Sequence, residues 1–266
     1  MKKDNTAPVM EDQACLLEEY EKLLIKRDQL ERDAGSYQIA FDAEFGDILI
    51  ENYELKVRCI RVKKEIAYCR RRINRGLPVD ADKMKTEIDN EMKLYKLQLK
   101  EMIAGVKGAR ETEQVSDYEL RLSRKIYKKI VKAIHPDIYP MTMEDENLKN
   151  LWNRVVKAYH KLDTTALADL DVLVKNALED LGEEAFEVDL TDIEDRIERV
   201  ERQINEILTT EPYSYGEILD DEEKKKSFIR QLALEREDLE QYFNSLTGTL
   251  DELLGHGGIK LTWQMS

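Results

Sequence analysis

Apolar residues recur along most of this chain with the spacing of helices that pack against one another. Between residues 41 and 73, ten positions follow steps of four and three, and nine of them are apolar. A period of 3.5 residues places such positions along one side of a helix, as in coiled coils. The polar member is Asn52, and a buried polar residue on such a seam costs stability but fixes the register. The ten positions are Phe41, Phe45, Ile48, Asn52, Leu55, Cys59, Val62, Ile66, Cys69 and Ile73.

Shorter stripes of the same kind flank this long helix. A first helix is predicted from about Glu11 to Asp33, ended by Gly35-Ser36. Gly76-Leu77-Pro78 ends the long helix, and the next helix is predicted from the N-cap Asp80 to about Val106. Because short breaks between long helices favour antiparallel neighbours, residues 11–110 are expected to form one coiled-coil bundle.

The C-terminal part repeats this pattern. Apolar positions again step by four and three between Ile193 and Ile207, and a last helix is expected from about Glu217 to Leu254. Residues 188–255 are therefore predicted to form a second helical hairpin. Residues 1–10 are expected to be disordered, and the tail 256–266 contains a segment, Ile259 to Trp263, suited to a short strand.

Composition supports an all-α fold. Charged residues make up 37% of the 266 residues, with only 11 glycines and 5 prolines, which favours long exposed helices over sheets. No run of apolar residues is long enough to span a membrane, and the N-terminus lacks the apolar region of a secretory signal. Cys15, Cys59 and Cys69 form no CxxC pair, so we expect buried, reduced thiols in a cytoplasmic protein, without a metal site or cofactor.

The net charge of −14 argues against general nucleic-acid binding. One basic run stands out, because Lys56 to Arg75 carries nine Lys or Arg residues against the single acid Glu65. This run suits either a nucleic acid or an acidic partner, or else a solvated helix face that pairs with acids of neighbouring helices. The second interpretation is favoured, since few aromatic side chains lie nearby to stack on bases.

The segment 112–181 carries the most specific signals. Ser116 and Glu119 have the spacing of a capping box, which predicts a helix from Asp117. Pro136 disfavours helical geometry at the preceding residue, so this helix is expected to end near Ile134. One of its faces should be core, with Tyr127, Ile130 and Ile134, while Arg121, Lys125, Lys128 and Lys132 share the opposite face. The stretch from Arg121 to Lys132 holds six basic residues and no acid. The six are Arg121, Arg124, Lys125, Lys128, Lys129 and Lys132.

His135-Pro136-Asp137 follows this helix, and then come a polar loop and a second helix. The stripe of the second helix comprises Leu148, Trp152, Val155, Tyr159 and Leu162, with Ala158 beside it. Two antiparallel helices joined by a long loop that begins with His-Pro-Asp resemble a J domain. The second helix also matches the family pattern K-F-x-x-I-x-x-A-Y-x-x-L at Trp152, Val155, Ala158, Tyr159 and Leu162.

This resemblance implies a function as a co-chaperone. In the family, the His-Pro-Asp loop and the basic helix face dock on an acidic surface of a DnaK-type chaperone ATPase and stimulate ATP hydrolysis. Carried over by position, His135, Pro136 and Asp137 would be the trigger and the six basic residues the docking face. Tyr127, Ile130, Ile134, Trp152, Val155, Ala158, Tyr159 and Leu162 would form the core.

The chain departs from the family pattern in three places, one of which is a loop about three residues longer than in a typical member. The family's short first helix is absent at its usual distance, and we expect the segment from Leu97 to Val106 to take its place as packing partner. The family's basic motif after the second long helix is also missing, since residues 164–174 are acidic there. The helices on either side would recruit an unidentified protein client, and their seams offer a route to homo-oligomers.

Other interpretations remain open. The rival of the co-chaperone is a coiled-coil scaffold that retains the J fold only as a structural module. His135 with Asp137 also has the residue types of an acid–base or metal pair, but no nucleophile or further ligand accompanies them, so no enzymatic activity is expected. His-Pro-Asp as a simple helix-ending turn is the plainest alternative. His160 and His256 are predicted to be ordinary surface residues.

Overall fold

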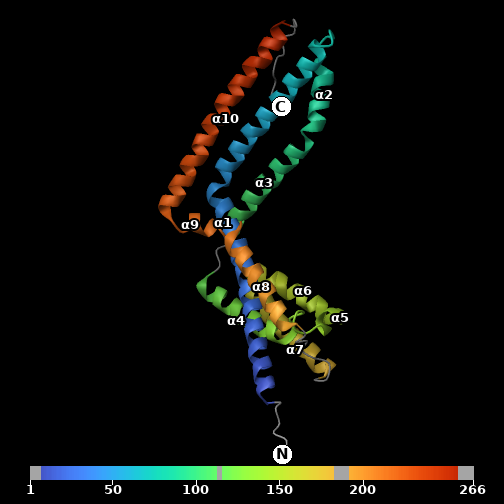
Figure 1. Cartoon of the computed structure of the whole chain (residues 1–266), viewed down its shortest axis with the longest axis vertical. Helices are drawn as coiled ribbons and strands as arrows, with labels where there is room; N and C mark the ends of the chain where they lie inside the picture. Colours follow the sequence, from blue (N-terminus) through green and yellow to red (C-terminus); the bar gives the residue numbers. More distant parts are fainter. Residues whose placement is uncertain (1–6, 113–115, 183–191, 257–266) are drawn as a thin grey trace, which may run out of the picture. The chain divides into compact units, whose positions relative to one another are not determined.

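The computed structural model describes residues 7–112, 116–182 and 192–256, and all secondary structure in these ranges is helical (Figure 1). This confirms the all-α fold for the described residues. The expected strand at Ile259 to Trp263 lies outside them, as do residues 1–6. The helices are α1 (Ala7–Ile73), α2 (Ala81–Glu91), α3 (Lys93–Glu111), α4 (Asp117–Ile134), α5 (Met141–Glu144), α6 (Glu146–His160), α7 (Thr164–Leu181), α8 (Ile193–Thr209), α9 (Tyr215–Leu219) and α10 (Glu222–His256).

Helix α1 is one continuous helix of 67 residues, so the break predicted at Gly35-Ser36 is wrong, and so is disorder from Ala7 onward. A glycine inside a helix costs only about 1 kcal/mol relative to alanine. Ala34 and Phe41, which lie before and after the glycine in the sequence, are both buried, so packing of the flanking helix outweighs that cost. The hydroxyl of Ser36 donates to the carbonyl oxygen of Arg32 at 3.3 Å, which satisfies it within the helix.

The chain divides into two compact units that do not follow the expected segments. Unit 1 comprises Met1–Gln38 and Glu113–Gly216, and unit 2 comprises Ile39–Thr112 and Glu217–Ser266. The residues expected to form one N-terminal bundle therefore belong to both units. The two helices expected to form a C-terminal hairpin are also separated, because α8 lies in unit 1 and α10 in unit 2. Apolar periodicity identifies packed helices but not their partners.

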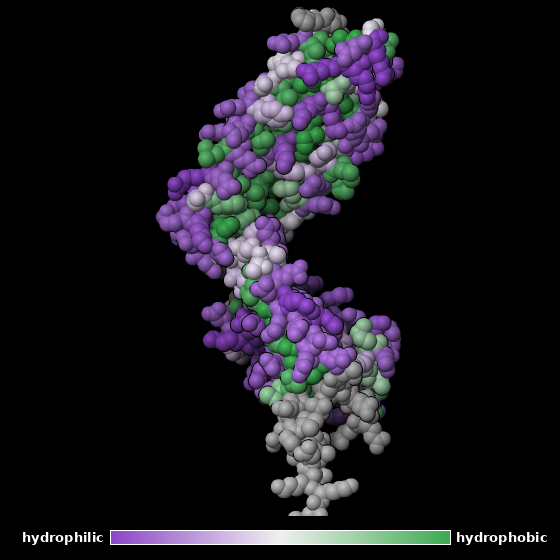
Figure 2. Space-filling model, in the orientation of Figure 1, coloured by the Kyte–Doolittle hydropathy of each residue, from purple (hydrophilic) through white to green (hydrophobic). Residues whose placement is uncertain are grey.

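In unit 2, α10 runs parallel to the second half of α1. The side-chain amide of Asn52 donates to the carbonyl oxygen of Leu232 at 2.8 Å, and the thiol of Cys59 lies 3.6 Å from the carbonyl oxygen of Leu239. Both contacts are seven residues apart on each helix, as expected for coiled-coil packing. The predicted seam thus closes within the chain, and Asn52 sets its register. Figure 2 shows hydrophobic side chains between hydrophilic ones along this unit.

Helices α2 and α3 run antiparallel to the same part of α1. Asp80 caps α2 as predicted, accepting the backbone N–H of Lys83 at 3.1 Å. The single helix expected from Asp80 to Val106 is interrupted at Met92, which is the C-cap of α2 and the N-cap of α3. Val106 packs at Gly46, where an added Cβ would lie 2.3 Å from a Val106 methyl carbon. A glycine is therefore required for the close approach of α1 and α3.

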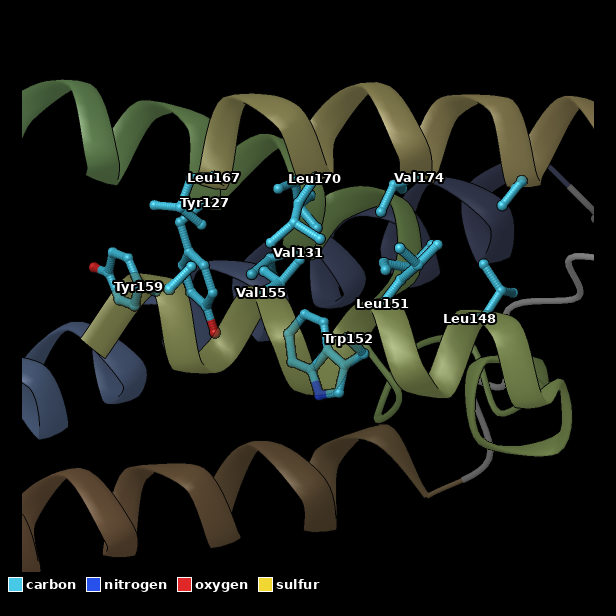
Figure 3. Packing of buried hydrophobic residues seen from close by; sticks show 14 residues of the cluster. Tyr127, Val131, Leu148, Leu151, Trp152, Val155, Tyr159, Leu167, Leu170 and Val174 are labelled. Atoms are coloured by element: carbon cyan, nitrogen blue, oxygen red, sulfur yellow. The ribbon is translucent and has the colours of Figure 1, made fainter. Parts of the chain in front are cut away.

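Unit 1 contains two hydrophobic clusters. The first joins α4, α6 and α7, and Figure 3 shows Leu167, Leu170 and Val174 of α7 pointing toward α6. The second joins the first half of α1 to α8 and includes Ile138 from the loop after α4. The expectation that Leu97 to Val106 packs on the α4–α6 pair is wrong, because that segment belongs to unit 2. Helix α1 takes this place, with Ile25 packed against the first cluster.

None of the helices described is long and apolar enough to cross a membrane.

Substitution of Gly46 by alanine should destabilise unit 2 by about 1–3 kcal/mol, because the new methyl group overpacks the contact with Val106. Gly248 is the matched control in the same unit. Its added Cβ meets nothing within 4 Å, so Gly248→Ala should stabilise its helix by up to about 1 kcal/mol. Thermal unfolding followed by circular dichroism measures both. Equal shifts for the two variants, or no rescue of Gly46→Ala by Val106→Ala, would contradict this close packing.

Candidate functional site

Helix α4 begins and ends where the local sequence predicts. The hydroxyl of Ser116 accepts the backbone N–H of Glu119 at 3.3 Å, and the Glu119 carboxylate accepts the backbone N–H of Ser116 at 3.0 Å. This reciprocal pair is the predicted capping box. At the other end, His135 is extended and caps the helix, as the following Pro136 requires.

The aromatic residues predicted for the core stack between α4 and α6. The rings of Tyr127 and Tyr159 are nearly parallel, with centroids 3.8 Å apart, and Trp152 lies beyond them (Figure 3). His135 packs edge-on against Trp152 at 4.8 Å. Since Tyr127 meets Tyr159 and His135 meets Trp152, α4 and α6 run antiparallel. The predicted core residues buried in this cluster are Tyr127, Ile130, Ile134, Trp152, Val155, Ala158 and Tyr159.

Leu162 is the exception among the predicted core residues. Helix α6 ends at His160, and Leu162 has a positive φ of 55° in the turn before α7. Its side chain is only partly buried and lies outside the cluster. The prediction extended the helical spacing past the end of the helix, and Asp163, which caps α7, explains why the chain turns there.

The six basic residues of α4 are all exposed, but they divide into two groups. Arg124, Lys129 and Lys132 form ion pairs with Asp33, Asp171 and Glu21, respectively. The other three, Arg121, Lys125 and Lys128, make no ion pair among the described residues. The electrostatic surface that remains available on α4 is therefore about half of the predicted face.

His135 is buried and only 2% exposed, although a docking role requires a projecting side chain. Its Nδ1 accepts the backbone N–H of Asp137 at 3.1 Å, so the neutral ring carries its proton on Nε2. This nitrogen faces the carboxylate of Asp28 at 4.0 Å. Pro136 is half-buried, whereas the side chain of Asp137 remains 46% exposed. His135 is therefore buried, whereas Asp137 remains at the surface of the protein.

The buried carboxylate of Asp28 links α1 to this loop. It accepts hydrogen bonds from the Arg27 guanidinium at 2.7 and 2.9 Å and from the Tyr127 hydroxyl at 2.8 Å. Burial, and then the negative charge of Asp28, raises the pKa of Tyr127 above its ordinary value, so the phenol stays protonated as the donor. A buried charge needs such partners, because an unpaired one is costly.

Two arginines outside the predicted site hold Asp137. A guanidinium nitrogen of Arg27 lies 3.6 Å from its carboxylate, and Arg196 of α8 donates to its backbone carbonyl oxygen at 3.0 Å. Ile138, the next residue, is 1% exposed between α1 and α8. The loop after α4, which was expected to be polar, thus contains the deeply buried apolar residue Ile138.

A further buried cation lies on α1. Arg32 donates to the Tyr159 hydroxyl at 3.3 Å, and its guanidinium carbon lies 5.2 Å from the centre of that ring. It also pairs with Asp33. Burial is the main cause that raises the pKa of Tyr159, to about 12, and the positive charge of Arg32 acts in the opposite direction. Asp28 and Arg32 thus attach α1 to the two stacked tyrosines.

Sequence reasoning missed these contacts of α1. One signal was present, because Leu16, Tyr20, Leu23 and Leu30 follow steps of four and three only if Arg27 fills the gap. A charged residue at an expected core position indicates a buried polar contact. Tyr127 and Tyr159 lie 99 and 127 residues along the chain from their partners Asp28 and Arg32, so local spacing does not identify these contacts.

The other predicted features of the chain have simpler environments. In the basic run Lys56–Arg75, Arg61, Lys64 and Arg71 pair with acids of α2, in agreement with a solvated helix face. Of the three free cysteines, Cys59 and Cys69 are buried as predicted, but Cys15 is exposed. His160 is exposed, and the side chain of His256 lies outside the described residues. No group of His, Cys, Asp or Glu in the described parts is arranged to hold a metal ion.

Comparison of the chain with protein-family models, with curated proteins and with solved structures finds no match.

The stability of unit 1 should depend on the protonation of His135. Burial lowers the pKa of this imidazole, outweighing the opposite effect of Asp28 and Asp137. The unfolded histidine takes up a proton as the pH falls through about 6.5, whereas the folded one does so only at lower pH. The free energy of unfolding should therefore fall below pH about 6.5, by at most about 1.4 kcal/mol per pH unit from this group.

Thermal unfolding followed by Trp152 fluorescence, in a Trp263→Phe background, measures this dependence. Between pH about 7.5 and about 5.5, the melting temperature should fall more for the parent chain than for His135→Gln, because the side chain at position 135 of the variant does not titrate. Equal decreases in the two proteins would show that the histidine is not held in its neutral form.

Proposed function

We propose that the α4–α6 pair acts as a J domain, which docks on a DnaK-type chaperone ATPase and stimulates its hydrolysis of ATP. The observation that carries this proposal is the extended corner at His135-Pro136-Asp137. It ends a basic amphipathic helix that packs antiparallel on α6 through stacked aromatic residues. Proline fixes this corner, so the position of Asp137 is set by the end of α4.

The charges on α4 suit an acidic partner surface. Arg121, Lys125 and Lys128 are exposed without an ion pair in the described residues, although the chain as a whole carries a net charge of −14. A local basic patch on an acidic protein orients the encounter with an acidic partner and increases the rate of association. The half-exposed carboxylate of Asp137 is the group on the loop with geometry suited to an arginine of that partner.

Unit 2 would provide the second function of a co-chaperone, the recruitment of an unidentified protein client. Its helices carry exposed apolar side chains, among them Leu94 and Leu234 at 77% and 62% exposure. Single exposed apolar residues are common on protein surfaces, so they do not indicate which client binds. A cytoplasmic location belongs to the same proposal and agrees with three unpaired cysteines.

The burial of His135 favours a second candidate, a scaffold that uses the α4–α6 pair only as a structural module. In that function, the histidine and Asp28 would serve to attach α1, and no ATPase would be stimulated. The two candidates differ in their dependence on Asp137. In a pull-down, a scaffold carrying Asp137→Asn should retain its partner proteins. A co-chaperone carrying the same substitution should no longer bind the chaperone ATPase.

Stimulation of a DnaK-type chaperone from the same organism tests the proposal in a single-turnover assay. The full chain should accelerate hydrolysis, and Asp137→Asn should abolish most of the acceleration, because the half-exposed carboxylate is lost while Arg27 keeps its hydrogen bonds to Asp28. Asp180→Asn removes an exposed acid of α7 and should have no effect. Stimulation by Asp137→Asn or His135→Gln equal to that of the parent chain would exclude the co-chaperone mechanism.

Reversal of charge on α4 tests the docking face separately. Replacing Arg121, Lys125 and Lys128 by glutamate should reduce stimulation at low salt, and the difference should shrink above about 0.15 M salt, where the Debye length is about 8 Å. The matched control reverses Arg154, Lys157 and Lys161, which are exposed on α6 and the turn after it. Similar losses for both triple variants would indicate an effect of net charge alone.

A further inference from the structure

The His135-Pro136-Asp137 loop is covered by two helices of its own unit. Helix α1 places Asp28 beside the His135 ring and Arg27 beside the Asp137 carboxylate. Helix α8 adds the bond from Arg196 to the Asp137 carbonyl oxygen. A partner protein that needs the histidine cannot reach it in this arrangement, because the ring is 2% exposed.

The cover extends beyond the three residues of the loop. Ile138 is buried in the cluster that joins α1 to α8, beside residues such as Leu24 and Val200. On the last turn of α4, Lys132 is paired with Glu21 of α1. The same two helices therefore bury the loop, anchor the residue after it and neutralise a cation of the predicted docking face.

The cover and the core beneath it are separate hydrophobic clusters. The cluster of α4, α6 and α7 contains no residue of α8, and it meets α1 through the partly buried Ile25 and through the polar contacts of Asp28 and Arg32 with its two tyrosines. The second cluster consists of residues of α1 and α8 together with Ile138, Tyr139 and Tyr213. Displacement of α8 would therefore free Ile138 and the Asp137 carbonyl oxygen without removing a side chain from the core that positions α4 against α6.

The contacts on Asp137 are also of a kind that yields to competition. The pair between Arg27 and Asp137 is 3.6 Å long, and the aspartate side chain is 46% exposed. Ion pairs at that exposure contribute little to stability and are screened by salt. An arginine of a docking partner would compete with Arg27 for the same carboxylate.

We infer that α1 and α8 form an autoinhibitory cover, which holds the His135-Pro136-Asp137 loop away from the chaperone ATPase until the cover is displaced. This inference rests on the proposed co-chaperone function. It adds a regulatory equilibrium, in which the fold described here is the inhibited form and a minor open population accounts for the stimulation expected of the full chain. Displacement of α1 would release His135, Asp137 and Lys132 together, because its Asp28, Arg27 and Glu21 contact these three residues.

The double variant Arg27→Gln/Arg196→Gln tests the cover in the full chain. It removes both cations from Asp137 and leaves the loop and the basic residues of α4 unchanged. Hydrogen exchange of the backbone amides of residues 137–139, followed by mass spectrometry, reports opening without reference to any ATPase. Exchange should rise roughly tenfold, as expected on loss of one charge-assisted hydrogen bond, and stimulation in the single-turnover assay should rise with it. Arg202→Gln makes the same change at an exposed position of α8 and should alter neither quantity.

The outcomes separate this inference from the proposed function. Unchanged hydrogen exchange would show that the two arginines do not hold the loop. Faster exchange with unchanged stimulation would show that the cover does not inhibit docking on the ATPase. Either result overturns this inference and leaves the proposed function standing. Faster exchange without stimulation by the parent chain or by the variant would instead overturn the co-chaperone function. Because Arg27 also compensates the buried Asp28, the double variant can lose its fold, which circular dichroism detects. The single variant Arg196→Gln then provides the same test, with hydrogen exchange and ATPase stimulation measured and interpreted in the same way.

Discussion

The buried carboxylate of Asp28 is the interaction on which the arrangement of unit 1 depends. A charge with only 8% of its side chain exposed must be compensated, and here Arg27 and the Tyr127 hydroxyl do so. One partner lies on its own helix and the other in the core of the α4–α6 pair. Since Asp28 also faces His135, a single compensated charge joins α1, the aromatic stack and the loop.

This interaction has two opposite effects on the His135-Pro136-Asp137 loop, because it fixes the loop's conformation and also covers the loop. The polar contacts determine the conformation and tautomer of His135, which a specific docking site requires. They also place α1 over the residues that a partner would contact. A co-chaperone with this structure is therefore expected to be regulated, whereas in a scaffold the same contacts serve only to attach α1.

Asn52 has a comparable role in unit 2. Its amide group bonds to the carbonyl oxygen of Leu232, and its buried carbonyl oxygen has no hydrogen-bond partner among the described residues. Such a residue lowers stability and excludes other registers of α1 against α10. In both units a buried polar residue on α1 specifies which surfaces meet, while apolar contacts provide most of the stabilisation.

Much of the local structure followed from the sequence. The spacing of apolar residues predicted the helices, the Ser116–Glu119 capping box predicted the start of α4, and Pro136 predicted its end. The core side of the α4–α6 pair was predicted correctly except at Leu162, where the helix had already ended. Gly35 misled the prediction, because a local helix breaker is outweighed by packing along a long helix.

The sequence by itself therefore determined the helical class, the capping signals and the apolar faces, since each depends on residues within a few turns of one another. Only the tertiary structure decided that α8 and α10 belong to different units and that α10 runs parallel to α1. It alone decided that His135 is buried between Trp152 of α6 and Asp28 of α1. These outcomes depend on contacts such as Asp28 with Tyr127, 99 residues apart, whose free energy exists only when the whole unit has folded.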